Sequence, residues 1–224
     1  LETTLAQVAH EILGIDVSKV KLIHGDTAFT PYSTGTWGSR CMVMSGGAVS
    51  RACQTLAKRV ALIGAFMLGT EVDQVTVRDG IVAGPERSVT IGEVAHVWFR
   101  RPQDLPPEVN GGGLEVTEGY KPQRDSGTFG YGAHAALVAV DPETGDVEIL
   151  DYVIVEDGGK LVNPMVVGGQ VYGGTAQGIG TALYEEMPFD ASGQPTPLTF
   201  ADYLLPGPTE DPVPRLVHMG TLSA

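Results

Sequence analysis

Apolar residues recur at helical spacing in four stretches of this chain, and these stretches predict its main helices. Residues 1–13 carry one apolar stripe, and Gly14 directly after it is suited to cap the helix in a left-handed conformation. The helical pattern returns from residue 41 to about residue 68, and again in a shorter form at 91–99. A fourth helix is predicted over 164–186, where the apolar residues are interrupted by many glycines.

Shorter runs rich in β-branched residues predict strands between these helices. Asp79-Gly80 is a strong signal for a tight hairpin turn, and the polar stretch DPETGD at 141–146 predicts a second hairpin connection. The predicted strands are 20–23, 75–77, 81–83, 114–120, 135–140, 147–155 and 215–219.

The order of these elements indicates the fold class. We expect an α/β fold of the α+β type, with mixed or antiparallel strands packed by helices. A segment with three prolines and three consecutive glycines, 102–113, is the best candidate for a boundary. The chain is therefore predicted to form two lobes, residues 1–105 and residues 106–224.

Two glycine-rich segments stand out against this background. Residues 24–40, HGDTAFTPYSTGTWGSR, have no apolar period and predict a long ordered loop, a feature that is usually functional in a compact domain. Residues 168–180, GGQVYGGTAQGIG, place glycines inside a predicted helix, where each costs up to about 1 kcal/mol relative to alanine.

Helical spacing sorts the residues of the second segment into two neighbouring stripes. One stripe contains only small residues and would let another backbone approach closely: Gly169, Gly173, Ala176 and Gly180. The other stripe places two amides around a glycine, as a flat polar ligand would require: Gln170, Gly174 and Gln177. At this point tight helix packing alone is as good an explanation of the glycines as a ligand site.

Composition and charge exclude several classes of partner. The chain has 27 acidic and 14 basic residues and a net charge of −13, which argues against binding to nucleic acid or to an anionic membrane. Cys41 and Cys53 lie about 18 Å apart if they share one helix, so they cannot form a disulfide. No signal peptide and no long apolar run is present, and we expect a cytoplasmic protein outside the membrane.

No familiar catalytic or metal-binding motif is present. The five histidines are scattered, no GxSxG elbow occurs, and no His, Cys, Asp and Glu set has metal-ligand spacing, so no catalytic residue and no protein metal ligand is assigned. Ser39 and Arg40 directly precede a predicted helix, where backbone amides and a guanidinium favour a phosphate. The residues alone thus indicate a phosphate-bearing cofactor, clamped by backbone amides, side-chain amides and one arginine.

Four co-linear motifs carry a resemblance to a known family. They are the 24–40 loop followed by a helix, GTFGYGAHAALVAVDPETGDVEIL, VEDGGKLVNPMVVGGQVYGGTAQGIGTALYEE and TFADYLLP. Over essentially its whole length the chain resembles an internal to C-terminal part of the cofactor-binding large subunit of molybdenum hydroxylases, the xanthine dehydrogenase, aldehyde oxidase and carbon monoxide dehydrogenase family. The resemblance implies a molybdenum-pterin cofactor, in bacteria usually the molybdopterin cytosine dinucleotide, whose dithiolene sulfurs rather than protein side chains hold the metal.

The resemblance also implies residue roles. The loop that holds the cofactor matches Gly38, Ser39, Arg40, Cys41 and Met42, and the glutamine near the pterin and metal matches Gln170. Gln177 is a weaker match, while Asp157 and Asn163-Pro164 match a structural turn. Cys41 does not correspond to the active-site cysteine of carbon monoxide dehydrogenases.

In this family a catalytic glutamate and a further cofactor-contacting glutamine belong to segments that this sequence does not contain. The resemblance therefore implies part of an oxidoreductase that hydroxylates an aldehyde, an N-heterocycle or a similar small molecule with water as oxygen source. The expected partners are the remaining large-subunit segments, an iron-sulfur subunit and a flavin (FAD) subunit in one multi-subunit assembly. The alternative is a noncatalytic cofactor-binding or assembly module that depends on a companion chain. In either case the sequence, which does not open with Met, is expected to be a processed product, a fragment or one piece of a longer polypeptide, inactive alone.

Overall fold

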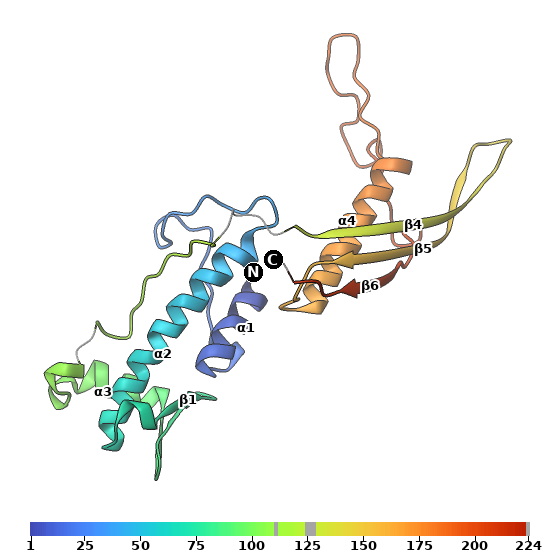
Figure 1. Cartoon of the computed structure of the whole chain (residues 1–224). Helices are drawn as coiled ribbons and strands as arrows, with labels where there is room; N and C mark the ends of the chain where they lie inside the picture. The colour runs from blue at the N-terminus through green and yellow to red at the C-terminus, as the bar shows by residue number, and fades with distance from the viewer. Residues whose placement is uncertain (110–111, 124–128, 223–224) are drawn as a thin grey trace. The chain divides into compact units, whose positions relative to one another are not determined.

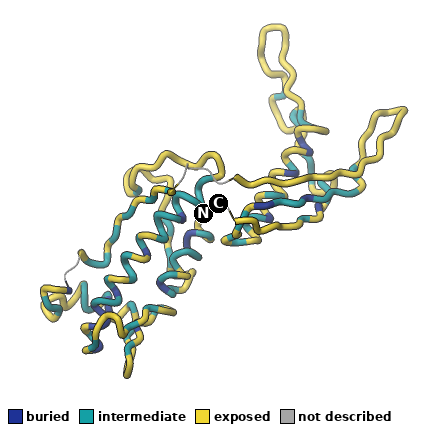
Figure 2. Tube along the Cα trace, viewed as in Figure 1, coloured by how far each residue is buried: buried dark blue, intermediate teal, exposed yellow. Residues whose placement is uncertain are grey.

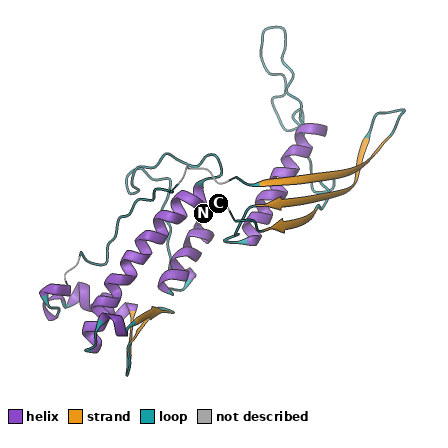
Figure 3. Cartoon of the chain, viewed as in Figure 1, coloured by secondary structure: helices purple, strands orange, loops and turns teal. Residues whose placement is uncertain are grey.

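The computed structural model describes residues 1–109, 112–123 and 129–222, and it divides the chain into two units, Leu1–Thr128 and Phe129–Ala224. The sequence placed the boundary at residues 105 and 106, whereas the contacts within the chain divide it after Thr128. Helices and mixed or antiparallel strands make up both units, which confirms the expected fold class (Figure 3). In the described residues no helix combines the length and apolar character that a membrane crossing requires.

Three helices are the main regular elements of the first unit (Figure 1). Helix α1 (Glu2–Leu13) ends where predicted, at Gly14, which adopts the left-handed conformation. Helix α2 (Gly47–Leu68) is the longest element, and α3 (Ile91–Arg100) begins with a complete capping box between Thr90 and Glu93. Short 3-10 turns lie between and after these helices: η1 (Val17–Lys19), η3 (Val72–Gln74), η4 (Pro102–Asp104) and η5 (Pro107–Val109).

A small antiparallel meander packs against α2 and supplies part of the core. Strands β1 (Thr76–Arg78), β2 (Ile81–Ala83) and β3 (Ser88–Thr90) pair in that order. The predicted Asp79-Gly80 turn is confirmed, since both residues have positive φ, at 52° and 73°. The least exposed apolar side chains of the core are Val60, Ile63, Val82 and Val94, so the meander and two helices share one buried center.

Two predicted strands of this unit are wrong. Residues 20–23 and 114–120 have no strand pairing, although both carry β-branched side chains. The second segment runs along α2 instead, where the Arg59 Nη1 donates to the carbonyl oxygens of Gly112, Gly113 and Glu115 at 2.8, 3.0 and 2.8 Å. The guanidinium thus satisfies the Glu115 carbonyl, near the start of the predicted strand, and the carbonyls of two glycines just before it. The polar residues 121–128 that follow, for which a loop is expected from their composition, fall mostly outside the described residues.

The second unit consists of one sheet and one long helix (Figure 1). Strands β4 (Tyr131–Val140) and β5 (Val147–Asp157) form the predicted hairpin, and β6 (Arg215–Met219) pairs with β5 in parallel. Helix α4 (Pro164–Leu183) follows β5, and the Asn163 side chain accepts from the Val166 N–H as its N-cap. Almost every residue of β4 is exposed, whereas β5 is partly buried (Figure 2).

Asp157 joins three segments of this unit at the end of β5. Its carboxylate accepts hydrogen bonds from the Gly159 N–H at 3.0 Å, the Thr221 N–H at 3.1 Å and the Tyr131 hydroxyl at 3.0 Å, and the residue is only 3% exposed. Hydrogen bonding to Thr221, and then to the Gly159 amide, lowers the pKa of the Asp157 carboxyl below its ordinary value. The turn that leads toward α4 is therefore tied both to β4 and to the segment after β6.

Candidate functional site

The loop ahead of α2 reaches the helix through two residues of unusual backbone conformation. Gly38 and Ser39 have φ values of 58° and 53°, and Ser39 is one of only two described non-glycine residues with positive φ. A serine rarely adopts this conformation, which in other proteins is concentrated at turns and ligand sites. The backbone between Trp37 and Arg40 is thereby turned sharply just before the helical segment starts.

Arg40 is held by its own loop. Its guanidinium carbon lies 4.1 Å from the centroid of the Trp37 ring, and its Nη2 donates to the Thr34 hydroxyl. The Nε of Arg40 is buried and has no hydrogen-bond partner among the described atoms. Two neighbours therefore orient Arg40, and its Nε is left as a donor. Such an arrangement suits a residue that binds an anionic or carbonyl ligand.

Sequence reasoning did not identify Thr34 and Trp37 as the residues that hold Arg40. The available signal was the spacing, because an aromatic ring and an arginine three residues apart in one tight loop can stack. The backbone turn between Trp37 and Arg40 contains the positive φ angles of Gly38 and Ser39, and the sequence does not reveal such an angle at a serine.

The helical segment opens with a π-helical turn, η2 (Met42–Gly46), for which Cys41 is the N-cap. The helix predicted from residue 41 to about residue 68 is confirmed, but its first turn is π-helical rather than α-helical. The Met42 thioether lies where a side chain at position 46 would begin, and the Tyr120 ring does the same at Gly47. Wide π turns occur often at functional sites, and here two glycines make room for the larger side chains.

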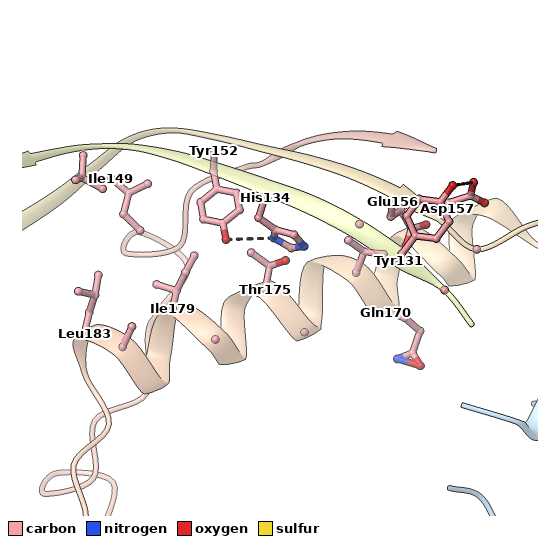
Figure 4. A pocket seen from close by; sticks show the side chains of 18 of the residues that line it. Tyr131, His134, Ile149, Tyr152, Glu156, Asp157, Gln170, Thr175, Ile179 and Leu183 are labelled. Carbon is pink, nitrogen blue, oxygen red and sulfur yellow. Dashed lines mark hydrogen bonds between the residues drawn. The ribbon is translucent and has the colours of Figure 1, made fainter. Parts of the chain in front are cut away.

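Gln170 lies in the second unit, on α4. Together with Gly174 and Gly178 it follows the four-residue spacing of the helix and lines an open groove of about 730 Å³ between α4 and strands β4 and β5. Figure 4 shows the Gln170 amide directed away from the strands, and the residue is exposed. Gln177 lies outside the groove lining, and its carbonyl oxygen accepts from the Thr181 hydroxyl.

Packing within the described chain does not account for most of the α4 glycines. A Cβ placed at any of four positions would meet no described atom within 4 Å: Gly169, Gly173, Gly174 and Gly178. Only Gly180 is crowded, where a Cβ would come within 2.9 Å of the Pro206 ring. No described segment approaches Gly169 or Gly173, so the expectation that they admit another backbone stays a prediction.

The opposite wall of the groove carries polar groups that sequence reasoning did not identify. His134 on β4 and Tyr152 on β5 form an edge-to-face pair, with 3.2 Å between His134 Nδ1 and the Tyr152 hydroxyl (Figure 4). On α4 itself, the Thr175 hydroxyl is buried between helix and sheet and has no partner in the part of the chain that is described. The positions of His134 and Tyr152 on the groove face of the sheet became recognisable only with the strand register. Within the described residues no three His, Cys, Asp or Glu side chains converge as metal ligands.

Comparison with known proteins places these features in a family. The sequence profile described as "Molybdopterin cofactor-binding domain" matches residues 1–212. Nicotine 6-hydroxylase large subunit from Paenarthrobacter nicotinovorans is 34% identical over 99% of this chain and 27% of the relative. Carbon monoxide dehydrogenase large chain from Hydrogenophaga pseudoflava is 31% identical over 94% of this chain and 26% of the relative.

Solved structures agree with this placement. The crystal structure of quinoline 2-oxidoreductase from Pseudomonas putida 86 matches with a TM-score of 0.83 and 32% identity over 98% of this chain and 28% of the other. This chain thus spans about a quarter of the length of the curated relatives it matches.

Proposed function

Because this chain belongs to the molybdopterin cofactor-binding domain family of the molybdenum hydroxylases, we propose that it binds the molybdenum cofactor, and that the Arg40 loop of the first unit and the glycine face of α4 in the second unit are each, taken separately, cofactor-binding elements. The observation that carries this proposal is that a Cβ added at any of four α4 glycines would meet no atom of the described chain within 4 Å. Each of these glycines costs up to about 1 kcal/mol in a helix relative to alanine, and no packing within the described chain offsets that cost. A flat ligand lying against the helix backbone accounts for them.

The residues present fit the chemistry of a pterin that carries phosphate. Gly38 and Ser39 form a backbone turn just before a helical segment, where free amide groups favour an anion. The Nε of Arg40 is a buried donor without a described partner. Cys41 and Met42 follow in the same turn and would contribute backbone contacts, since the Met42 side chain is occupied with Gly46. On α4, Gln170 offers an exposed amide, next to Gly174, that can donate and accept at the edge of a pterin ring.

When bound, the cofactor would supply the two-electron redox chemistry of molybdenum, and this chain would supply binding and orientation. We propose that the whole enzyme hydroxylates an aldehyde, an N-heterocycle or a similar small molecule with water as oxygen source. The general base is a glutamate outside this chain, as the family resemblance implies. The cytosine dinucleotide form of the cofactor, iron-sulfur and FAD partner subunits and a cytoplasmic location belong to the same proposal. The large-subunit names of the relatives favour it over a noncatalytic assembly module.

An isotope experiment on the whole enzyme tests the reaction class. The protein that contains this chain is purified with its native partners, assayed for molybdenum and pterin, and supplied with aldehydes and N-heterocycles and an artificial electron acceptor. In water enriched with oxygen-18, the product is expected to carry the heavy isotope. Incorporation from molecular oxygen instead, or a preparation that turns over without molybdenum, contradicts the proposal.

The same assay tests whether this chain is active without the rest of the enzyme. The 224-residue chain supplied with cofactor is expected to show no turnover, because no carboxylate in it has the context of the family's base. Turnover abolished by changing one carboxylate of this chain would place the base within it.

A further inference from the structure

The half of α4 that carries Gln170 has little side-chain packing to hold it in place. Helix α4 contains six glycines, and its single buried large apolar side chain, Ile179, belongs to its second half. Within residues 164–174 the one buried residue is Gly168, which has no side chain, and the valines are only half-buried. Because buried side chains normally fix a helix against a sheet, polar contacts ahead of the helix gain importance for where Gln170 lies.

The Asp157 carboxylate supplies such contacts directly ahead of α4. Its Oδ1 accepts from the Gly159 N–H at 3.0 Å and from the Thr221 N–H at 3.1 Å, and its Oδ2 accepts from the Tyr131 hydroxyl at 3.0 Å. Gly159 has a φ of 69°, and a Cβ there would lie 3.4 Å from the Thr221 carbonyl oxygen. One carboxylate thus fixes the turn between β5 and α4 both to β4 and to the segment after β6.

These contacts lie at the same end of the groove as Gln170. Tyr131, Asp157 and Gln170 all line the groove, and Figure 4 shows the three at one end of it. Residues 158–162 lead from Asp157 to Asn163, the N-cap of α4. Since backbone hydrogen bonds make successive helical turns move together, a displacement of this short connection also displaces Gln170.

We propose that Asp157 is a positioning residue for the cofactor, because its hydrogen bonds hold the start of α4 in the place from which Gln170 and the glycine face bind the ligand. The inference rests on the proposed function of α4 and goes beyond the structural turn that the sequence indicates. Asp157 is 3% exposed and three donors occupy its carboxylate, so it acts through the backbone rather than as a ligand contact.

Two substitutions at Asp157 test the role of its hydrogen bonds. Asp157→Ala removes both carboxylate oxygens, whereas Asp157→Asn keeps one oxygen that can accept from both N–H groups. In the whole purified enzyme, Asp157→Ala is expected to lose molybdenum and pterin about tenfold faster than the wild type, and Asp157→Asn to stay within about twofold of it.

Asp190→Ala is the matched control for the loss of a turn carboxylate. Asp190 accepts from the Ser192 and Gln194 N–H groups in the connection from α4 to β6, outside the groove lining. This variant is expected to retain its cofactor like the wild type. Equal rates of cofactor loss for Asp157→Ala and Asp190→Ala would overturn the proposal.

A double-mutant cycle distinguishes positioning from a general loss of stability. If Asp157 acts through α4, then Asp157→Ala and Gln170→Ala disturb the same contact, and their combined effect on the rate of cofactor loss should be smaller than the product of the two. Arg40→Ala, in the other unit, is the comparison and should combine with Asp157→Ala multiplicatively. Multiplicative effects with both partners would mean that Asp157 only stabilises the fold.

Failure of the proposed function gives a different result. If Gln170→Ala and Arg40→Ala by themselves leave the rate of cofactor loss unchanged, these elements do not hold the cofactor, and the inference falls with them. If Gln170→Ala accelerates the loss and Asp157→Ala does not, α4 remains a cofactor-binding element and only the positioning role falls. Should Asp157→Ala fail to fold, Tyr131→Phe, which removes one donor, takes its place, and an unchanged rate in that variant would overturn the positioning role.

Discussion

Helices α2 and α4 both contain glycines that cost helix stability, but the two helices use them differently. In the α2 segment each of three glycines makes room for a larger side chain. Gly46 lies against Met42, Gly47 against the Tyr120 ring, and Gly64 against Val82, whose Cγ1 would be 2.7 Å from an added Cβ. On α4, four glycines have no described neighbour within 4 Å.

The comparison separates two meanings that a glycine pattern has in a sequence. A buried glycine that touches a side chain serves packing, and its replacement overfills the core. An exposed glycine inside a helix has no packing role within the described chain and leaves room for a group outside it to approach the backbone. The neighbours of the Cβ position distinguish the two kinds.

Replacement of Gly64 by valine should have the largest effect on folding. The added methyl groups would overlap Val82, which is fully buried, and overpacking of this kind costs about 1–3 kcal/mol. The urea midpoint of the variant is expected to fall, while Gly92→Val on α3, where the nearest atom is 3.7 Å from the added Cβ, keeps a midpoint near that of the wild type. An unchanged midpoint for Gly64→Val would mean that α2 and β2 are not packed as described.

Replacement of Gly174 by valine should affect cofactor binding rather than folding. We expect the variant to fold with nearly unchanged stability and to lose most of its cofactor, because the added side chain stands on the open face of α4. Molybdenum and pterin per chain, measured in the whole purified enzyme together with the unfolding midpoint, check both parts. The Gly92→Val variant is the control for cofactor content. Full cofactor content in Gly174→Val would remove α4 from the proposed site.

Arg40→Ala tests the other proposed cofactor-binding element, the loop of the first unit. Loss of a charge-assisted hydrogen bond of about 1.5–3 kcal/mol corresponds to roughly 10- to 100-fold weaker cofactor binding. Arg51→Ala, at an exposed position of α2, serves as the matched loss of positive charge. If the two variants retain equal cofactor, Arg40 only stabilises its loop through Trp37 and Thr34.

The smallest effect is expected from Gly173→Ala. With open space around the position, alanine should raise the stability of the cofactor-free chain by up to about 1 kcal/mol through higher helix propensity. A thermal unfolding midpoint a few degrees above that of the wild type is the expected readout. A lower midpoint would show that another segment packs against this face of α4 after all.

Local patterns were sufficient for much of the fold. Helix α1 with its Gly14 cap, the Asp79-Gly80 hairpin, the β4–β5 hairpin and α4 were all predicted from periodicity and turn residues. The predictions for 20–23 and 114–120 failed because a strand exists only with a partner, and Arg59 takes that place along 112–115. The site residues came from the family resemblance, and their roles stay a prediction that the variants above test.

The sequence by itself determined which segments are helical, where the hairpins turn and which family the chain resembles, because these depend on residues close together in the chain. Tertiary structure decided which glycines have a side chain packed beside them and which have open space there. It also decided which groups orient Arg40 and how Asp157 links β4 to the segment after β6. The physical reason is that a cavity, a stacked ring or a satisfied carboxylate is defined by atoms that meet only after folding. Spacing along the chain constrains where such atoms are, but not what lies opposite them.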